Sequence, residues 1–509
     1  MPTTYEIHPA IGICRVGDSD EFHFGPDPFE VPPTIYRDST PSKKLKKQAV
    51  RFRVFKCDRN ADGSLAAFSE ITTAGGFIIE WTVELANRKA TADALEAGIP
   101  TPRNRTQSNR ALLAITPGAK SISGISVPPV EFDNCVFLGH QLRNTAGQNV
   151  TLGAIRTDDH GRLIVTGGRG DSGSVVNPPQ FQHFADNDNW WDDTSDGTVR
   201  AKVTLADGSV QTPLSAWVLT GPPDFAPAIA NNVTLYDVAY QAAVDNHWRT
   251  VPAIPSYRDD IKPILKRFVD MQWVNDNFRS LFGVGGPHDF AADWTAFGDP
   301  TQKQSERQSF FSKLRDPSGA AQPHAPELPP LNDETDTNSI QMLTPVQYQI
   351  LKLWAASTFE GGSAPPPAAA PSPDTLTRAV LDATAGAAFY PGIESNRIMR
   401  DRSHYVSPFR IQADLTQPGH LVPGDMTKGN AIPWQSDFAA CRQQGTLGWW
   451  PAQRPDDVRT DPNSAAIVTW SRKSEGVKML QNWKQLGVVK AAQDAAGNTV
   501  FVEDERTLG

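Results

Sequence analysis

The hydrophobic period of this chain changes near residue 250. From Tyr5 to about Tyr240, short β-branched or alternating runs are separated by Gly, Pro, Asn and Asp. These runs are VRFRVF (50–55), GFIIEWTVEL (76–85), VEFDNCVFL (130–138), RLIVTGG (162–168), RAKVTL (200–205) and SAWVLT (215–220). Runs of this kind at sheet-like intervals predict strands. Between Ser256 and Leu281 the apolar residues instead recur at helical spacing. The predicted class is α+β, with a β-rich N-terminal domain followed by a mainly helical C-terminal domain.

The length of the chain predicts more than one domain. Its 509 residues exceed what a single hydrophobic core usually supports, so two or three domains are expected. We divide the chain into a β-rich domain (1–250), a helical region with a long surface loop (251–360), a linker (361–374) and a C-terminal domain (375–509). The linker is assigned from its sequence, because GGSAPPPAAAPSP is rich in Pro, Ala and Gly and has no capacity for a core.

Charge and hydropathy exclude two classes of partner. The net charge of −9 comes from interspersed charges, without a long basic tract that would engage nucleic acid. No run approaches the roughly 18 apolar residues of a membrane span, and the start MPTTYEIHPAIG lacks the features of a signal peptide. We therefore expect neither nucleic acid nor a membrane as partner. The expected location is cytoplasmic, with export by a non-standard route left open.

Cysteine usage excludes a disulfide framework. The four cysteines, Cys14, Cys57, Cys135 and Cys441, are widely spaced, and none forms a CxxC pair of the kind that binds zinc. We expect no metal. We treat three of these cysteines as free thiols and consider Cys441 separately.

The stretch from Leu421 to Val458 brings an acid, a thiol and two indoles close together in sequence. Asp437 precedes Cys441 by four residues, which stacks the two side chains on one face of a helix. A carboxylate beside a thiol can take its proton, and the thiolate is the reactive form of cysteine. Trp449 and Trp450 are the nearest aromatic candidates for attachment. The alternative is that Cys441 and both tryptophans are ordinary core residues.

Four further segments, in one order along the chain, accompany this stretch. They are IHPAIGICRVGDS (7–19), LKKQAVRFRVF (45–55), LTPVQYQILKLWA (343–355) and FYPGIESNRIMRD (389–401). Together the five segments resemble the family of L-lysine epsilon-oxidases and glycine oxidases that carry a cysteine tryptophylquinone. In that family a Cys and a Trp of one chain are joined by a thioether, and the indole is oxidised to an ortho-quinone.

The resemblance implies a site and a reaction. It assigns the thioether to Cys441 with Trp450 or Trp449, and assigns to Asp437 a role in forming the cofactor and as the base that takes the substrate proton. We favour Trp450, because Pro451 restricts the residue before it to extended backbone. The implied activity is oxidation of a primary amine of a free amino acid by O2, either of the lysine epsilon-amine or of the glycine type. The products are an aldehyde or oxo acid, ammonia and hydrogen peroxide.

The resemblance also implies a partner, a flavoprotein that matures the cofactor. A homo-oligomer is possible. Two other functions stay open at this stage. The chain could be an unmodified relative that acts as a binding or scaffold protein, or a serine hydrolase with Ser172 of GDSGS as its nucleophile.

A further acidic stretch, DNDNWWDDTSDG at 186–197, starts like a calcium loop. Asp192, Thr194, Asp196 and Gly197 fit the first half of such a loop, but its twelfth position falls on Val203, where a bidentate Glu is required. We therefore interpret the stretch as a solvated turn.

Overall fold

The structure is a computed structural model, and it describes most of the chain. The described residues are 3–93, 101–133, 135–137, 148–176, 179–319, 328–330, 342–362, 371–386, 396–440 and 453–505. Cys441, Trp449, Trp450 and the central part of the predicted linker lie outside them. The domain boundaries given above stay a prediction.

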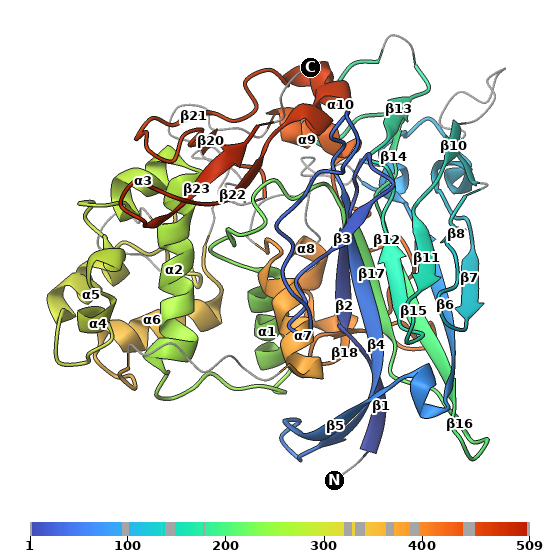
Figure 1. The fold of residues 1–509 in the computed structure, drawn as a ribbon, viewed down its shortest axis with the longest axis horizontal. Helices are drawn as coiled ribbons and strands as arrows, with labels where there is room; N and C mark the ends of the chain where they lie inside the picture. The colour runs from blue at the N-terminus through green and yellow to red at the C-terminus, as the bar shows by residue number, and fades with distance from the viewer. Residues whose placement is uncertain are drawn as a thin grey trace.

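Thirteen strands of the described chain form one large sheet (Figure 1). Its main path runs β7-β6-β15-β17-β2-β4-β12-β11-β8, and β1, β3 and β5 pair with β4 while β16 pairs with β15. The strands are β1 (Thr3–His8), β2 (Ile11–Arg15), β3 (Phe22–Phe24), β4 (Lys47–Arg59), β5 (Leu65–Ile71), β6 (Ile78–Ala86), β7 (Ala119–Ser123), β8 (Val130–Glu131), β11 (Ala154–Thr157), β12 (Leu163–Thr166), β15 (Ser195–Thr204), β16 (Val210–Gln211) and β17 (Ala216–Gly221). Most pairs are antiparallel, but β17 and β2 run parallel at the centre. The β-rich N-terminal prediction is confirmed.

Two hydrophobic cores lie on the two faces of this sheet. Ile11 and Ile13 of β2 contribute to the core that the sheet shares with the helices. Cys14 of β2 and Val218 of β17 contribute to a second core on the other face. Because both faces are covered, these central strands are buried at every residue instead of at alternate ones.

The helices follow the sheet in sequence and gather on one side of it (Figure 1). They are α1 (Leu235–Asp245), α2 (Lys262–Asp270), α3 (Asp276–Phe282), α4 (Trp294–Phe297), α5 (Gln304–Ser312), α6 (Pro345–Ala355), α7 (Pro373–Asp382), α8 (Asn396–Met399), α9 (Trp434–Ala440) and α10 (Met479–Asn482). Thr344 and Ser372 begin α6 and α7 with side chains that accept hydrogen bonds from the third helical N–H. The mainly helical character of the C-terminal part is confirmed. No helix among the described residues combines the length and apolar character that a membrane crossing needs.

Short two-stranded sheets complete the fold. They are β9 (Cys135–Phe137) with β10 (Gln148–Val150), β13 (Ser172–Ser174) with β14 (Trp190–Asp192), β18 (Tyr405–Ser407) with β19 (Arg410–Ile411), β20 (Asp457–Val458) with β21 (Val468–Thr469), and β22 (Val488–Gln493) with β23 (Thr499–Asp504). The hairpin β13–β14 and the last hairpin are relevant to function, because they flank α9 in Figure 1.

The predicted helical stretch 256–281 is helical but interrupted. Its apolar face is buried as the spacing predicts, with Ile264 and Phe268 of α2 in the core. The α-helix ends at Asp270, and Asn275 starts α3 as a new N-cap that accepts a hydrogen bond from Phe278. The apolar period continues across this break because both helices pack on the same core.

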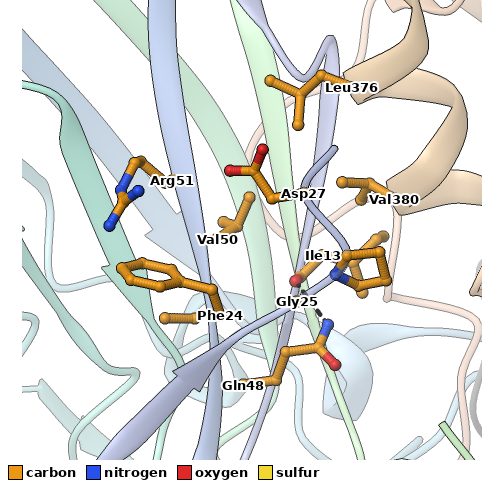
Figure 2. Close-up of a pocket in the computed structure, with 11 residues that line it drawn as sticks. Ile13, Phe24, Gly25, Asp27, Gln48, Val50, Arg51, Leu376 and Val380 are labelled. Carbon is orange, nitrogen blue, oxygen red and sulfur yellow. Dashed lines mark hydrogen bonds between the residues drawn. The ribbon is translucent and has the colours of Figure 1, made fainter. Parts of the chain in front are cut away.

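The contact between the sheet and α7 is tight. Figure 2 shows Val50 of β4 facing Leu376 and Val380 of α7 across a small cavity. Gln48 also lines this cavity and donates a hydrogen bond to the Ile13 carbonyl. The cavity measures about 10 Å³, room for at most one water molecule. This contact is therefore packing and offers no space for a ligand.

Candidate active site

Helix α9 carries Asp437, the one predicted site residue that the structure describes. The side chains from Trp434 to Phe438 are all buried, and Asp437 is 0 % exposed. The helix ends at Ala440, directly before Cys441. The predicted helical turn at Asp437 is confirmed. The contact of Asp437 with Cys441, and the thioether between Cys441 and Trp450 or Trp449, stay predictions.

The N-terminus of α9 is held by Asp192. The Asp192 carboxylate accepts hydrogen bonds from the Trp434 N–H at 3.1 Å and from Lys89 Nζ at 2.8 Å. The Asn87 amide (2.9 Å) and the Thr194 hydroxyl (2.7 Å) donate to its other oxygen. Burial lowers the pKa of Lys89, and the Asp192 charge opposes that shift. The helix start is thus fixed to β14 by a buried ion pair with its remaining acceptors in use.

Asp196 holds the segment that leads into α9. Its carboxylate accepts hydrogen bonds from the N–H groups of Gly424, Met426 and Thr427, from the Thr427 hydroxyl and from the Trp217 indole, at 2.6–3.3 Å. Burial raises the pKa of Asp196 to about 6, although these donors act in the opposite direction. A strand of the N-terminal sheet therefore positions the backbone just before α9.

These contacts correct the interpretation of residues 186–197 as a solvated turn. Asp192 and Asp196 are both 0 % exposed, and residues 193–195 between them are buried as well. Acidic and hydroxyl side chains have the composition of an exposed turn, but here they satisfy backbone N–H groups of a distant segment. Asp196 is already part of β15, and Asp192 lies three residues before that strand, so the β-branched run that follows was the available sequence signal.

The GDSGS loop also contacts α9. The Ser172 hydroxyl donates to the Gln435 side-chain oxygen at 2.8 Å, and the Gln435 amide donates to the Gly170 carbonyl at 3.0 Å. Gly170 has a φ of +80°, and a Cβ there would lie 2.4 Å from the Trp483 ring. Among the described residues, the partner of Ser172 is thus an amide oxygen, which cannot take its proton as a histidine would. The serine hydrolase alternative is not favoured.

Two tryptophans that follow Cys441 in sequence lie around α9. The Trp483 ring packs edge-on against Trp434 with centroids 5.4 Å apart. Trp470 packs against Phe225 with the two rings tilted and their centroids 4.8 Å apart, and Phe225 in turn contacts Phe438 at 6.0 Å. Both tryptophans are buried. Proximity to Cys441 in sequence identifies only Trp449 and Trp450 as candidates. Trp470 and Trp483 were therefore missed as neighbours of α9.

The chain that follows residue 452 returns to α9 through Arg454. Its Nε donates to the Phe438 carbonyl at 2.8 Å, and its Nη1 lies 3.2 Å from the Asp456 carboxylate. Arg454 is 0 % exposed and Asp456 is 3 % exposed. The hydrogen bond from Arg454 to the Phe438 carbonyl therefore joins residues that lie before and after segment 441–452 in the sequence.

The arrangement has the components of an acid–base site on a rigid support. Asp437 sits on a helix whose start, lead-in and last turn are each anchored by buried polar contacts. Among the described residues, the groups with metal-ligand spacing are Glu6 with His8 and Cys57, and Asp158 with Asp159 and His160, and neither lies at α9. The described part of α9 contributes a buried carboxylate, and Trp434, Phe438 and Trp483 place aromatic rings on and beside the helix.

Replacing Asp192 by Asn tests the anchor. We expect Asp192→Asn to lower the free energy of unfolding by about 3–5 kcal/mol, because it leaves the Lys89 ammonium buried without its counter-charge. Urea denaturation measures the change. Asp504→Asn is the matched control, because it breaks the exposed pair with Lys490 and should cost at most about 1 kcal/mol. Equal losses in the two variants would remove Asp192 from this role.

Comparisons with known proteins give matches along most of the chain. The family model described as L-lysine epsilon oxidase N-terminal matches residues 8–220, and the model of the L-lysine epsilon oxidase C-terminal domain matches residues 327–470. L-lysine 6-oxidase from Marinomonas mediterranea is 25% identical over an alignment 575 positions long, which covers 93% of this chain and 76% of that protein.

Solved structures have the same fold. The structure of the Schiff base intermediate of L-Lys epsilon-oxidase from Marinomonas mediterranea with L-Lys matches with a TM-score of 0.78 at 23% identity, over 99% of this chain and 95% of that one. A second structure, of the epsilon-lysine oxidase from the same organism, matches with a TM-score of 0.79 at 22% identity and the same coverage.

Proposed function

This chain belongs to the L-lysine epsilon-oxidase family, and from that membership we propose that it is a quinoprotein amino-acid oxidase. The observation that carries the proposal is the match of both family models. The C-terminal model spans the stretch that contains Asp437 and Cys441. One amine, one O2 and one water give an aldehyde or oxo acid, ammonia and hydrogen peroxide. The alternative of an unmodified scaffold protein is not favoured.

The cofactor that we propose is a cysteine tryptophylquinone built from this chain. The surroundings of α9 suit it, because Asp437 is buried, Cys441 follows it by four residues in the sequence, and several indoles are close in sequence or in space. The quinone supplies an electrophilic carbonyl and a two-electron sink that unmodified side chains lack. We assign the thioether to Cys441 and to Trp450, with Trp449 as second choice. Trp470 and Trp483 are alternative partners for the Cys441 thioether, because both pack around α9.

Asp437 is proposed to move protons at two stages. During maturation its carboxylate takes the proton of the Cys441 thiol, which makes the sulfur nucleophilic. During turnover it takes the proton from the substrate carbon that bears the amine. Burial disfavours the charged form of a carboxylate and so favours proton acceptance. The anchors at Asp192 and Arg454 keep the helix in place while the proton moves.

The substrate that we propose is a free amino acid. The similar protein is named for L-lysine, which makes the lysine side-chain amine the first candidate and glycine the second. The partner that we propose is a flavoprotein that oxidises the indole during maturation. A homo-oligomer and a cytoplasmic location are further proposals, which size-exclusion chromatography and cell fractionation test.

A peroxide assay tests the function. Protein co-expressed with its maturation flavoprotein is expected to release hydrogen peroxide and ammonia in equal amounts from a panel of amino acids and primary amines. If lysine is the substrate, Nα-acetyl-lysine and Nε-acetyl-lysine identify the reacting amine, because each leaves only one amine free. Protein with intact quinone absorbance that makes no peroxide from any member of the panel would contradict the proposal.

A further inference from the structure

A cavity of about 470 Å³ lies between the first strand and the helices, apart from the candidate active site. Its walls come from β1, the end of β4, α1, α7 and the turn between β18 and β19. None of its lining residues belongs to α9 or to the residues that hold α9, and α7 and β18 lie well away from α9 in Figure 1. Its volume is in the usual range for small-molecule sites, which often lie where two parts of a fold meet.

The floor of the cavity is a buried polar network. Glu6 accepts hydrogen bonds from Arg59 at 2.8 Å and from Arg410 at 3.2 Å, and its carboxylate lies 2.9 Å from His8 Nε2. Burial acts to raise the pKa of Glu6, but Arg59, His8 and Arg410 together hold it far below its usual value. Burial and the Arg410 charge lower the pKa of His8 to about 4. The floor therefore holds a charged Glu6 and a neutral His8 at neutral pH.

Positive charge exceeds negative charge around the cavity. Four arginines line it, Arg59, Arg249, Arg378 and Arg410, against two carboxylates, Glu6 and Asp374. Arg59 engages both carboxylates, with contacts of 2.8 Å to each. The lining side chains thus carry a net charge of +2, and Asp382 outside the lining offsets one of these charges at Arg378. The remaining positive charge favours an anionic ligand.

Arg249 is the lining arginine that has no ion pair among the described residues, although its charge acts on the exposed Asp62 carboxylate. Its Nη1 donates to the carbonyls of Asp62 and Trp248, both at 3.1 Å. No carboxylate of the described residues lies within 4.0 Å of it, whereas Arg378 has Asp382 at 3.1 Å.

An aromatic wall stands beside these charges. The rings of Tyr236 and Phe409 stack with centroids 5.0 Å apart and planes 13° from parallel. Arg378 lies over the Tyr236 ring at 4.9 Å. Because Phe409 and Arg378 cover the Tyr236 ring, an apolar group meets the edge of this stack, while a carboxylate attached to that group reaches a guanidinium.

Two other uses of the cluster are excluded by its contacts. Glu6, His8 and Cys57 have metal-ligand spacing, but the Arg59 and Arg410 guanidinium groups already occupy Glu6 and would repel a cation. The Thr377 hydroxyl lies 2.9 Å from His8 Nδ1, and His8 Nε2 lies 2.9 Å from Glu6. This hydroxyl–imidazole–carboxylate chain resembles the triad of a hydrolase. The Thr377 oxygen also accepts from the Ala10 N–H at 3.0 Å, and Thr377 is 3 % exposed, so it cannot reach a substrate.

We infer that this cavity is a second binding site, which takes a small organic carboxylate. The carboxylate pairs with Arg249, assisted by Arg378, and the apolar body of the ligand lies against Tyr236 and Phe409. The cavity is lined by neither the residues of α9 nor its anchors, so this binding does not depend on the oxidase activity.

Calorimetry on the full-length matured protein tests this site with benzoate, hexanoate, benzamide and inorganic phosphate at constant ionic strength. Benzoate and hexanoate are expected to bind, whereas benzamide, which has the shape of benzoate without its charge, is not. Arg249→Gln and Arg378→Gln should each weaken benzoate binding about tenfold or more, because a charge-assisted hydrogen bond is lost. Arg279→Gln is the matched control, because it removes an exposed arginine that pairs with Asp276, and it should leave binding unchanged.

The contrary outcomes are equally specific. Absence of carboxylate binding at millimolar concentration overturns the inference, as does binding of phosphate alone. Benzoate binding that survives both arginine substitutions, or that is displaced by the amine substrate, assigns the ligand to another site. Both variants lie at the rim of the cavity, where Arg249 is half-buried and Arg378 is exposed, so folding should be preserved, and circular dichroism checks this.

Discussion

Asp437→Asn is expected to give folded protein that lacks most of its quinone absorbance and turns over at least about 100-fold more slowly, the lower end of what a positioned acid–base group contributes. The amide cannot accept a proton, so neither the thiol nor the substrate carbon would be deprotonated at this position. Its size is nearly that of the carboxylate, so the packing of α9 is kept. Absorbance spectra and peroxide release measure the two effects separately.

Asp425→Asn is the matched control for this variant. Asp425 lies in the segment that leads into α9, where its carboxylate accepts a hydrogen bond from the Val422 N–H at 3.0 Å. It is not part of the proposed chemistry. Its replacement should leave absorbance and turnover close to those of the parent protein. Asp437→Asn protein with full absorbance and normal turnover would exclude Asp437 from both steps.

The fold could be predicted where the hydrophobic pattern is local. GFIIEWTVEL alternates, and Trp81, Val83 and Leu85 of β6 are indeed buried on one face. The helical spacing after Ser256 likewise identifies the buried face of α2. The order of the strands in the sheet could not be predicted, because β4 collects partners from five other strands spread over the first 166 residues.

The candidate site was only partly predictable, because its support is built from distant segments. The Asp437 helix follows from local spacing, but Asp192 and Asp196 act on Trp434 and Thr427, more than 200 residues further along the chain. Nothing in a short window distinguishes such an acid from one in an exposed turn. The same holds for Ser172, whose local motif resembles a protease loop although its hydroxyl binds Gln435 of α9.

Cys441→Ser should reduce peroxide production to background, because serine cannot form the thioether and the quinone is then not assembled. The cost to stability should be small, since only one sulfur atom is replaced by oxygen. Absorbance, peroxide release and the intact mass of matured protein are the measurements. Cys14→Ser is the matched control, because Cys14 is a buried thiol that donates to the Val165 carbonyl and serine keeps that donor. It should retain the cofactor and the activity.

Peptide mass spectrometry of the matured parent protein then identifies the tryptophan. We expect the Cys441 peptide to be joined to a tryptophan peptide with two added oxygens, and to resist thiol reductants. Trp450 is the first choice, because Pro451 restricts its backbone. A link to Trp470 or Trp483 would keep the cofactor but move it to an indole that already packs around α9, and it would show that spatial packing decided the partner. Active protein that yields Cys441 as a free, alkylatable thiol would rule out the quinone, since no other proposed step gives the sulfur a role.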